Sequence, residues 1–351
     1  MNRLKARVAF ITCAGADIAR SMKPECRDGL RYVLRRLCCW LLAGLLPVIA
    51  GAAGYPEKPI RLIVAAAPGG SADAMARTIQ PYLANLLGQS IVIDNRAGAS
   101  GIIGIDLVAK APPDGYTLLV NTSTHTTLPG LKAKLPFDLV KDFTPVSLVV
   151  SQANLLVVHP SVPAQSVREL VALARARSSS INFASGGVGT SPHLAGELLN
   201  LVAGVKMAHV PYKGAGPALV DLLGAHVQIM FVGPLAIAQH IKAGRLRVLA
   251  VSNSRRSSVF PEVPTMAEAG FRGVESGTWY GIAAPSKTPK ATVDRLYAAI
   301  KQGVSTPELR SRFELQGVEI VASSPAEFAP YILEQIAKLT KLVRAAGLRP
   351  E

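Results

Sequence analysis

Two glycine-containing loops carry residue types that suit the binding of a small anion. The first loop, Pro68 to Asp73, follows an apolar run and opens a helical pattern, and the second loop, Ala184 to Thr190, repeats this arrangement. The first turn of a helix leaves backbone amides unpaired, and the positive helix end attracts anions. Glycine lets the backbone approach a ligand closely. The loops therefore predict carboxylate binding, with an ordinary tight turn as the alternative for each loop. Asp73 suits helix capping, ligand contact or both.

The sequence lacks the patterns of nucleotide-binding, metal and catalytic sites. No glycine loop ends in Gly-Lys-Ser/Thr, and Gly98, Gly101 and Gly104 only imitate the Gly-x-Gly-x-x-Gly spacing. Ser185 stands outside a Gly-x-Ser-x-Gly elbow. The six histidines lie apart, without the paired spacing of a zinc site. We therefore expect no catalytic residue, no metal ion and no cofactor, although His193 is close enough in sequence to approach the second loop.

Alternating strand and helix patterns must position the two loops. Such alternation predicts an α/β architecture with parallel sheets, and 351 residues exceed what one hydrophobic core usually organises. We therefore predict two lobes, each a mostly parallel sheet flanked by helices, with a cleft between them. The predicted strands are residues 60–67, 91–93, 116–121, 155–159, 181–184, 207–210, 227–231, 246–251, 279–284 and 318–322.

Helix starts are marked by side chains that pair with the unpaired amides of a first turn. In the second loop we expect Ser191 to be the N-cap and Pro192 the first helical residue. Pro325 likewise begins a predicted helix that runs to Ala346. Capping boxes are predicted at Ser166 to Glu169, Thr265 to Glu268, Ser305 to Glu308 and Ser324 to Glu327.

The N-terminal segment predicts export. Arg35 and Arg36 precede the apolar run 37–50, which is followed by small residues. This is the layout of a secretory signal peptide, with cleavage expected near Ala52 to Gly54. A run of this length is shorter than the roughly 20 residues that cross a bilayer, so a permanent anchor is the weaker alternative. Translation from Met22 would also give an ordinary signal peptide.

Composition predicts a folded protein, and its net positive charge favours anionic ligands. Hydrophobic residues make up 49% of the chain and charged residues 17%, which suits buried sheets rather than disorder. All four cysteines precede residue 54, as do nine Lys and Arg and three Asp and Glu. The remainder has 29 basic and 20 acidic residues, a net charge of +9. Its scattered basic residues argue against nucleic-acid binding and favour anionic solutes.

A series of short motifs resembles a known family. Together the motifs are similar to those of the Bug-type substrate-binding proteins of tripartite tricarboxylate transporters, and they span nearly all of the chain after residue 54. In chain order they are Tyr55-Pro56, Lys58-Pro59-Ile60, Pro68-Gly69-Gly70 with Asp73, Asn95-Arg96 with Gly98, Asp114-Gly115-Tyr116-Thr117, Gly189-Thr190 with His193-Leu194-Ala195-Gly196-Glu197, Val210-Pro211-Tyr212-Lys213-Gly214, Asp221-Leu222-Leu223-Gly224, Val263-Pro264-Thr265 with Glu268-Ala269-Gly270, Trp279 and Ala284-Pro285.

The resemblance implies a fold, a location and a role. The fold would be that of a two-lobed periplasmic binding protein, similar to type II, with lobe 1 formed by residues 55–155 and 277–351 and lobe 2 by residues 156–276. The protein would be a periplasmic monomer without enzymatic activity that delivers a small organic acid to inner-membrane subunits of a tripartite transporter. Ordered water would help the loops, here residues 68–73 and 185–193, to hold the carboxylate.

The ligand-binding residues that we expect come from both loops and from the nearby motifs. They are Ala67, Gly69, Gly70, Ser71, Asp73, Ser123, Ser185, Gly187, Gly189, Thr190, His193, Tyr212 and Lys213.

Two departures from the family pattern concern the cleft wall. Residues 64–67 read Val-Ala-Ala-Ala where relatives usually place Pro-Phe, and Val232-Gly233 replaces an Asp-Asn pair often seen there. If that acid meets a ligand ammonium in relatives, its replacement favours acids without an amino group. The identity of the acid stays open.

Two other functions remain as alternatives. A periplasmic sensor would share the fold and the ligand and would present the closed state to a signalling receptor, so neighbouring genes would distinguish it. A secreted α/β enzyme is the less favoured alternative, because no catalytic set is recognisable.

Overall fold

Residues 54–176, 181–345 and 347 are described by the computed structural model. The predicted signal peptide and all four cysteines lie outside the described residues. Gly54–Glu351 form one compact unit. Within the described residues of that unit, no helix is both long and apolar enough to cross a bilayer.

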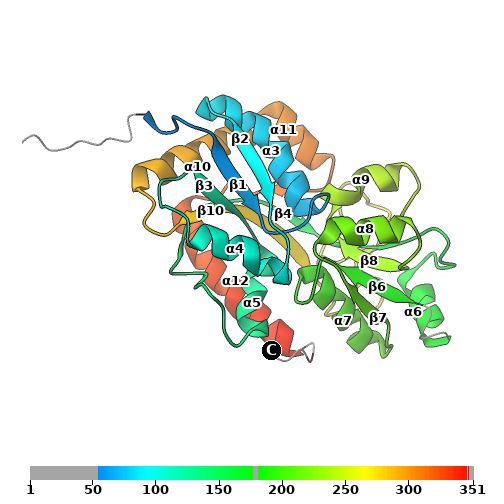
Figure 1. The fold of residues 1–351 in the computed structure, drawn as a ribbon. Helices are drawn as coiled ribbons and strands as arrows, with labels where there is room; N and C mark the ends of the chain where they lie inside the picture. Colours follow the sequence, from blue (N-terminus) through cyan, green and yellow to red (C-terminus); the bar gives the residue numbers. More distant parts are fainter. Residues whose placement is uncertain (1–53, 177–180, 346, 348–351) are drawn as a thin grey trace, which may run out of the picture. The chain divides into compact units, whose positions relative to one another are not determined.

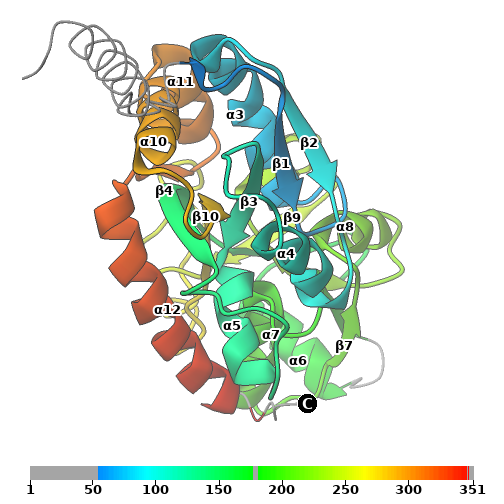
Figure 2. The same cartoon turned by 60° about the vertical axis from the view of Figure 1, so that its left-hand side comes forward.

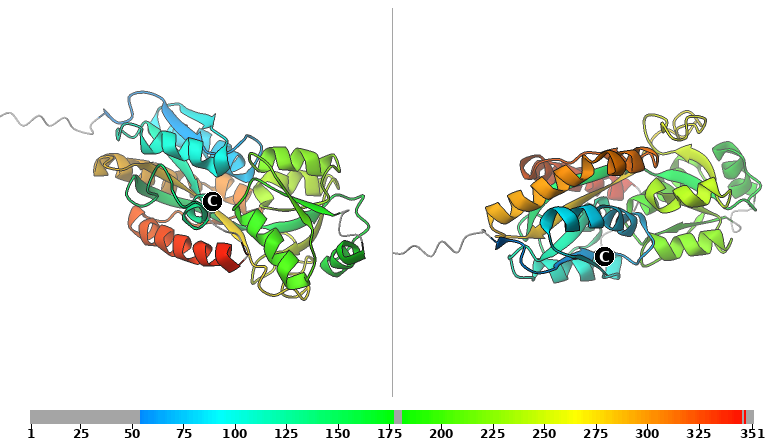
Figure 3. Two further views of the ribbon diagram at one scale, coloured as in Figure 1. Left: turned by 60° about the horizontal axis from the view of Figure 1, so that its bottom comes forward. Right: turned by 90° about the horizontal axis from the view of Figure 1, so that it is seen from above.

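A mixed sheet with helices on both faces forms the first lobe (Figure 1). Its strand order is β11-β4-β10-β3-β1-β2. Helices α3, α10 and α11 share a core with one face, and α4, α5 and α12 pack on the other (Figures 1 and 3). The strands are β1 (Ile60–Val64), β2 (Ile91–Asn95), β3 (Thr117–Thr122), β4 (Phe143–Ala153), β10 (Gly277–Pro285) and β11 (Glu319–Ile320). The helices are α3 (Ser71–Leu87), η2 (Ala99–Gly101), α4 (Ile102–Ala109), α5 (Ser123–Leu131), α10 (Lys290–Val304), α11 (Pro307–Glu314) and α12 (Pro325–Ala345).

Apolar spacing explains how these elements pack. The β1 strand is almost wholly apolar and is buried between two helix layers. In α3, buried Met75, Ile79, Leu83 and Leu87 recur every four residues and so lie on one face of the helix. The long α12 lies along α5 and β4 (Figure 2).

A second mixed sheet forms the second lobe. Its strand order is β7-β6-β8-β5-β9. Helices α6 and α7 share one core with this sheet, and α8 and α9 share another. The strands are β5 (Leu155–Val158), β6 (Asn182–Ser185), β7 (Ala208–Pro211), β8 (Ile229–Val232) and β9 (Arg247–Val251). The helices are α6 (Val167–Ala176), α7 (Ser191–Ala203), α8 (Ala215–Leu223) and α9 (Pro234–Lys242).

The predicted α/β class is confirmed, but both sheets are mixed rather than mostly parallel. In the first sheet β1 runs parallel to β2 and β3, whereas β10 runs antiparallel to β3 and β4. In the second, β6 runs parallel to its neighbours and β5 runs antiparallel to β8 and β9. The chain leaves the first sheet through β4 and returns to it through β10. Because these neighbours carry the chain in opposite directions, they pair antiparallel.

The predicted capping boxes have different outcomes. The box at Ser324–Glu327 is confirmed by reciprocal hydrogen bonds between side chain and backbone at the start of α12. Thr265 and Glu268 make the same reciprocal hydrogen bonds, but residues 266–270 form a turn and not the predicted helix. In the box at Ser166–Glu169, the serine caps the glutamate amide, but the glutamate reaches back one residue farther. The box at Ser305–Glu308 is wrong, because Thr306 is the N-cap of α11 and the Ser305 hydroxyl bonds back into α10.

Candidate functional site

A cavity of about 330 Å³ lies between the two lobes and is lined by residues of both. Only one cationic and one acidic side chain, Lys213 and Asp73, belong to the wall that the described residues form. The wall consists of residues 65–67, 70–73, 98–101, 120, 122, 124, 125, 154, 186–188, 190, 192, 211–215, 232, 233, 278 and 280.

Helix N-termini from both lobes meet at this cavity. The first residues or N-caps of α3, α5, α7, α8 and α9 belong to its wall. Among these five, only α7 has a side-chain hydrogen bond at its N-cap in the described residues; the other four have none. Backbone amides and helix dipoles therefore supply a positive potential where the wall has few cationic side chains. This arrangement suits an anionic ligand.

The first loop is closed by its own acidic side chain. The Asp73 Oδ2 accepts hydrogen bonds from the Gly69 amide at 3.0 Å and from the Arg77 Nε at 2.9 Å. Burial alone would raise the pKa of Asp73, but these hydrogen bonds and the charge of Arg77 hold it below its ordinary value. Asp73 therefore carries a negative charge at neutral pH and fixes the start of α3. Its role as a bracing residue is visible in the structure.

The first loop also rests on the opposite lobe. The Ala67 amide donates to the Lys213 carbonyl at 3.2 Å, and the Ser71 hydroxyl lies 3.4 Å from the Gly233 carbonyl. A Cβ at Gly216 would lie 1.8 Å from the carbonyl oxygen of Pro68. Glycine is therefore required at position 216 for this approach, and the two lobes are in a closed arrangement at the cavity.

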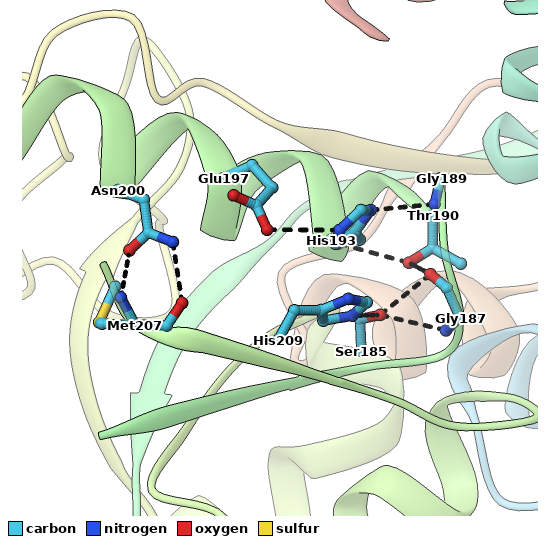
Figure 4. A network of polar contacts seen from close by, with 9 residues as sticks. All are labelled: Ser185, Gly187, Gly189, Thr190, His193, Glu197, Asn200, Met207 and His209. Atoms are coloured by element: carbon cyan, nitrogen blue, oxygen red, sulfur yellow. Dashed lines mark hydrogen bonds and ion pairs between the residues drawn. The ribbon is translucent and has the colours of Figure 1, made fainter. Parts of the chain in front are cut away.

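The second loop is held by side chains of its own lobe (Figure 4). The Ser185 hydroxyl accepts from the Gly187 amide at 3.1 Å and lies 2.7 Å from the Nε2 of His209. The Thr190 hydroxyl donates to the Gly187 carbonyl at 2.9 Å and accepts from the His193 amide at 3.3 Å. Thr190, rather than the predicted Ser191, is thus the N-cap of α7. Thr190 and Ser191 both precede Pro192 and both carry a hydroxyl, so the sequence alone does not show which of them is the N-cap.

Two stacked imidazoles lie behind the second loop. Gly189 donates its amide to the Nδ1 of His193 at 3.0 Å, so this histidine in its neutral form carries its proton on Nε2, which faces Glu197 at 3.5 Å. The rings of His193 and His209 are stacked with centroids 3.9 Å apart. Burial, together with the neighbouring His193, lowers the pKa of His209 to about 4. His209 is therefore neutral at pH 7, and the ring beside the Ser185 hydroxyl is uncharged.

The structure brings eight of the predicted ligand-binding residues into the described cavity wall. They are Ala67, Gly70, Ser71, Asp73, Gly187, Thr190, Tyr212 and Lys213. The phenol of Tyr212 donates to Asp221 at 2.5 Å, so its hydroxyl is already engaged.

The other five predicted residues lie outside this wall. Ser185 and His193 brace the second loop from behind, as described above. Gly69 faces Gly216 of the opposite lobe, and Gly189 packs against α5, where a Cβ would lie 1.7 Å from Leu131.

Ser123 belongs to the wall of a separate cavity of about 490 Å³. Its neighbours Thr122 and Thr124 line the cavity between the lobes instead. Successive residues at a helix start point in different directions, which explains the separation.

Several polar wall residues escaped the sequence prediction. Thr122 ends β3, and Thr124 and His125 lie in the first turn of α5, which is the same strand-to-helix arrangement as in the two glycine loops. That arrangement was the available signal, but no glycine marks it. Asn154 reaches the cavity from the connection between β4 and β5, and Tyr280 reaches it from β10; local sequence patterns do not reveal such positions. Within the described residues, no cluster of His, Cys, Asp or Glu suits a metal ion.

A family profile and a related protein sequence both assign this chain to the same family. The sequence profile described as "Tripartite tricarboxylate transporter family receptor" matches residues 75–348. The chain is 37% identical to Protein BugT of Bordetella pertussis over 297 residues, which are 84% of this chain and 91% of BugT.

Solved structures show the same fold. The structure of the periplasmic binding protein BugD is 32% identical, has a TM-score of 0.82, and the match covers 85% of this chain and all of BugD. R. palustris Rpa4515 with adipate is 33% identical, has a TM-score of 0.81, and the match covers 85% of this chain and 100% of Rpa4515. The predicted two-lobed fold of a periplasmic binding protein is therefore confirmed.

Proposed function

Because this chain belongs to the family of tripartite tricarboxylate transporter receptors, which are solute-binding proteins and not enzymes, we propose that it captures a small organic acid between its lobes. The convergence of helix N-termini on the cavity is the observation that carries this proposal. A carboxylate placed there would accept hydrogen bonds from backbone amides in both lobes. A ligand held from both sides stabilises the closed state relative to the open one.

The neighbouring structure that contains adipate supports a carboxylate as the ligand class. The few charged side chains of the described wall agree with recognition by backbone dipoles rather than by an arginine clamp. The expectation that Val232 and Gly233 disfavour amino acids is part of the proposal, because both residues line the cavity.

The cellular setting follows from the family and from the N-terminal sequence. The mature protein would begin near Ala53 to Tyr55 in the periplasm, and as a monomer it would deliver its acid to the membrane subunits of a tripartite transporter. N-terminal sequencing of the secreted protein tests the cleavage site. A mature protein that retains Cys38 and Cys39 would contradict it.

The division into lobes is also part of the proposal. The lobe boundaries would lie at residues 155/156 and 276/277. These positions are within two residues of Asn154 and Gly277, where the chain passes between the two sheets.

A thermal-shift screen followed by calorimetry tests the binding of acids. The panel contains mono-, di- and tricarboxylates, each paired with its uncharged primary amide as the matched control. An acid present at a hundred times its Kd should stabilise the protein by about 2.7 kcal/mol, and its amide should not. The proposal fails if no acid stabilises the protein or if the amides bind as tightly as the acids.

A further inference from the structure

His125 is a buried histidine in the cavity wall that the loop chemistry does not use. It lies in the first turn of α5, its side chain is 3% exposed, and it lines the cavity between the lobes. Its Nδ1 lies 3.0 Å from the Oδ1 of Asn121 at the end of β3.

The hydrogen bonds around Asn121 fix the tautomer of His125. The backbone amide of Thr122 donates to the same Oδ1 at 3.0 Å, and an amide N–H can only donate. The Asn121 atom is therefore the oxygen, so the His125 Nδ1 must carry the proton. Burial lowers the pKa of His125 to about 3, which keeps the ring neutral at pH 7. The Nε2 consequently carries a lone pair and acts only as an acceptor.

The Nε2 lies beside Gly101, which also belongs to the cavity wall. Among the described residues, none donates a hydrogen bond to the His125 Nε2. The neighbouring Gly101 has no side chain, and a Cβ there would lie 3.6 Å from the Nε2. The amide of Gly101 is committed to the Gly98 carbonyl at 2.9 Å. The cavity wall thus contains an uncharged acceptor that can receive a hydrogen bond from a ligand.

We propose that His125 accepts a hydrogen bond from a hydroxyl group of the ligand, and that the protein prefers hydroxycarboxylic acids to the corresponding acids without the hydroxyl. This inference rests on the proposed function. The carboxylate would be held by helix N-termini, and the hydroxyl would donate to the Nε2. A ligand ammonium fits less well at His125, because a neutral imidazole supplies no counter-charge. In the same wall the Asp73 Oδ2 is paired with Arg77, and its Oδ1 has no partner among the described residues.

Matched pairs of acids measure this preference directly. Calorimetry would compare malate with succinate, lactate with propionate, and 3-hydroxybutyrate with butyrate. For at least one pair, the wild-type protein should bind the hydroxy acid roughly 2- to 12-fold more tightly, which is the range expected for one net hydrogen bond. Aspartate and alanine, which carry an ammonium in place of the hydroxyl, should bind more weakly than malate and lactate.

The variant His125→Asn separates this role from a structural one. Asparagine retains a donor near Asn121 but has no atom at the position of the Nε2. The ratio of the two Kd values should fall to about one in this variant, even if both affinities decline. His226→Asn, an exposed histidine outside the cavity wall, is the matched control and should keep the wild-type ratio.

The possible results distinguish the two proposals. A hydroxyl preference that disappears in His125→Asn supports the inference. Binding of acids without any hydroxyl preference, a preference that persists in His125→Asn, or tighter binding of the amino acids overturns it while leaving the proposed function intact. If no acid binds to the wild-type protein, the proposed function fails and this inference fails with it.

Discussion

The two glycine loops begin helices in the same way but are held by different parts of the molecule. The second loop is braced by Ser185, Thr190, His193 and His209, all from its own lobe. The first loop has Asp73 as an internal brace, and its outer surface rests on residues 213–216 of the opposite lobe. The second loop also meets the first lobe, where Gly189 packs against Leu131 and the Ser100 hydroxyl donates to the Val188 carbonyl. Its internal hydrogen bonds are nevertheless more numerous than those of the first loop. Changes at the first should alter closure, and changes at the second should alter local stability.

The largest effect is expected where the first loop meets the opposite lobe. In Gly216→Ala the new methyl group would overlap the Pro68 carbonyl, which no flexible side chain can relieve. Such overpacking costs about 3 kcal/mol, so the Kd for the identified acid should rise roughly 150-fold. The folded protein should remain stable, because alanine suits a helix better than glycine.

Calorimetry and thermal melting check this prediction. The control is Gly224→Ala at the other end of α8, where the nearest atom would lie 3.5 Å from the added Cβ. A Gly216→Ala variant that binds within twofold of the wild type would show that the closed contact is not needed for capture.

Acid pH should weaken the brace of the second loop. The unfolded His209 binds a proton near its ordinary pKa of 6.5, whereas in the folded protein its pKa is about 4. The unfolded state therefore binds more protons between these values, and the free energy of unfolding falls as the pH drops from about 6.5 to about 4. Because the ring is partly exposed, we expect a loss of about 2 kcal/mol or less from this residue.

Urea unfolding at several pH values measures this loss. The variant His209→Phe retains a ring against Phe183 and should show a smaller decrease over the same range. The control His226→Gln alters an exposed histidine. If the free energy of unfolding falls equally in His209→Phe and in the wild type, His209 is not the cause of the loss of stability at acid pH.

Loss of the α7 cap should have a smaller effect. Thr190→Ala removes the hydroxyl that accepts from the His193 amide, and loss of an N-cap costs about 1 kcal/mol in the free energy of unfolding. The affinity for the acid should fall about fivefold, because the same hydroxyl also fixes the Gly187 carbonyl. Thr190→Ser should restore both quantities in denaturation and binding experiments. Failure of serine to restore them would mean that the methyl group, not the hydroxyl, matters.

The smallest effect is expected at Tyr212, where the ring lines the cavity but the hydroxyl bonds to Asp221. Tyr212→Phe should therefore change the Kd by less than about twofold, since no hydrogen bond to the ligand is lost. Direct titration of the identified acid measures this change. A tenfold loss would instead place the hydroxyl against the ligand.

The sequence predicted those features of the site that depend on local backbone chemistry. Glycines, hydroxyls and a proline placed the start of α7 correctly to within one residue, and the first glycine loop marked the start of α3. By contrast, Ser185 and His193 were expected to face the ligand but turn inward. His209, which holds Ser185, comes from β7, 24 residues farther along the chain. Local patterns contain no information about that contact.

The sheet topology was harder to predict for a related reason. The predicted strands did not include β4, because Ser147, Ser151 and Gln152 interrupt its apolar residues. Their partners, Ser323, Glu319 and Tyr280, all lie more than 120 residues away in the chain. Without β4, the antiparallel pairing with β10 was not apparent, and the sheets were predicted to be mostly parallel.

Asn154 lies where the chain passes directly from β4 into β5. Its backbone amide donates to the Ser276 carbonyl, its side-chain amide donates to Ser191 and Ser276, and its side-chain oxygen accepts from Thr278. Two neighbouring connections that are tied together at one point form a hinge about which the lobes would rotate. Each closure would then return the same amides to the same positions. The geometry of the site would thus be set by the hinge at Asn154. Ligand binding would need to supply only the energy that favours the closed state over the open one.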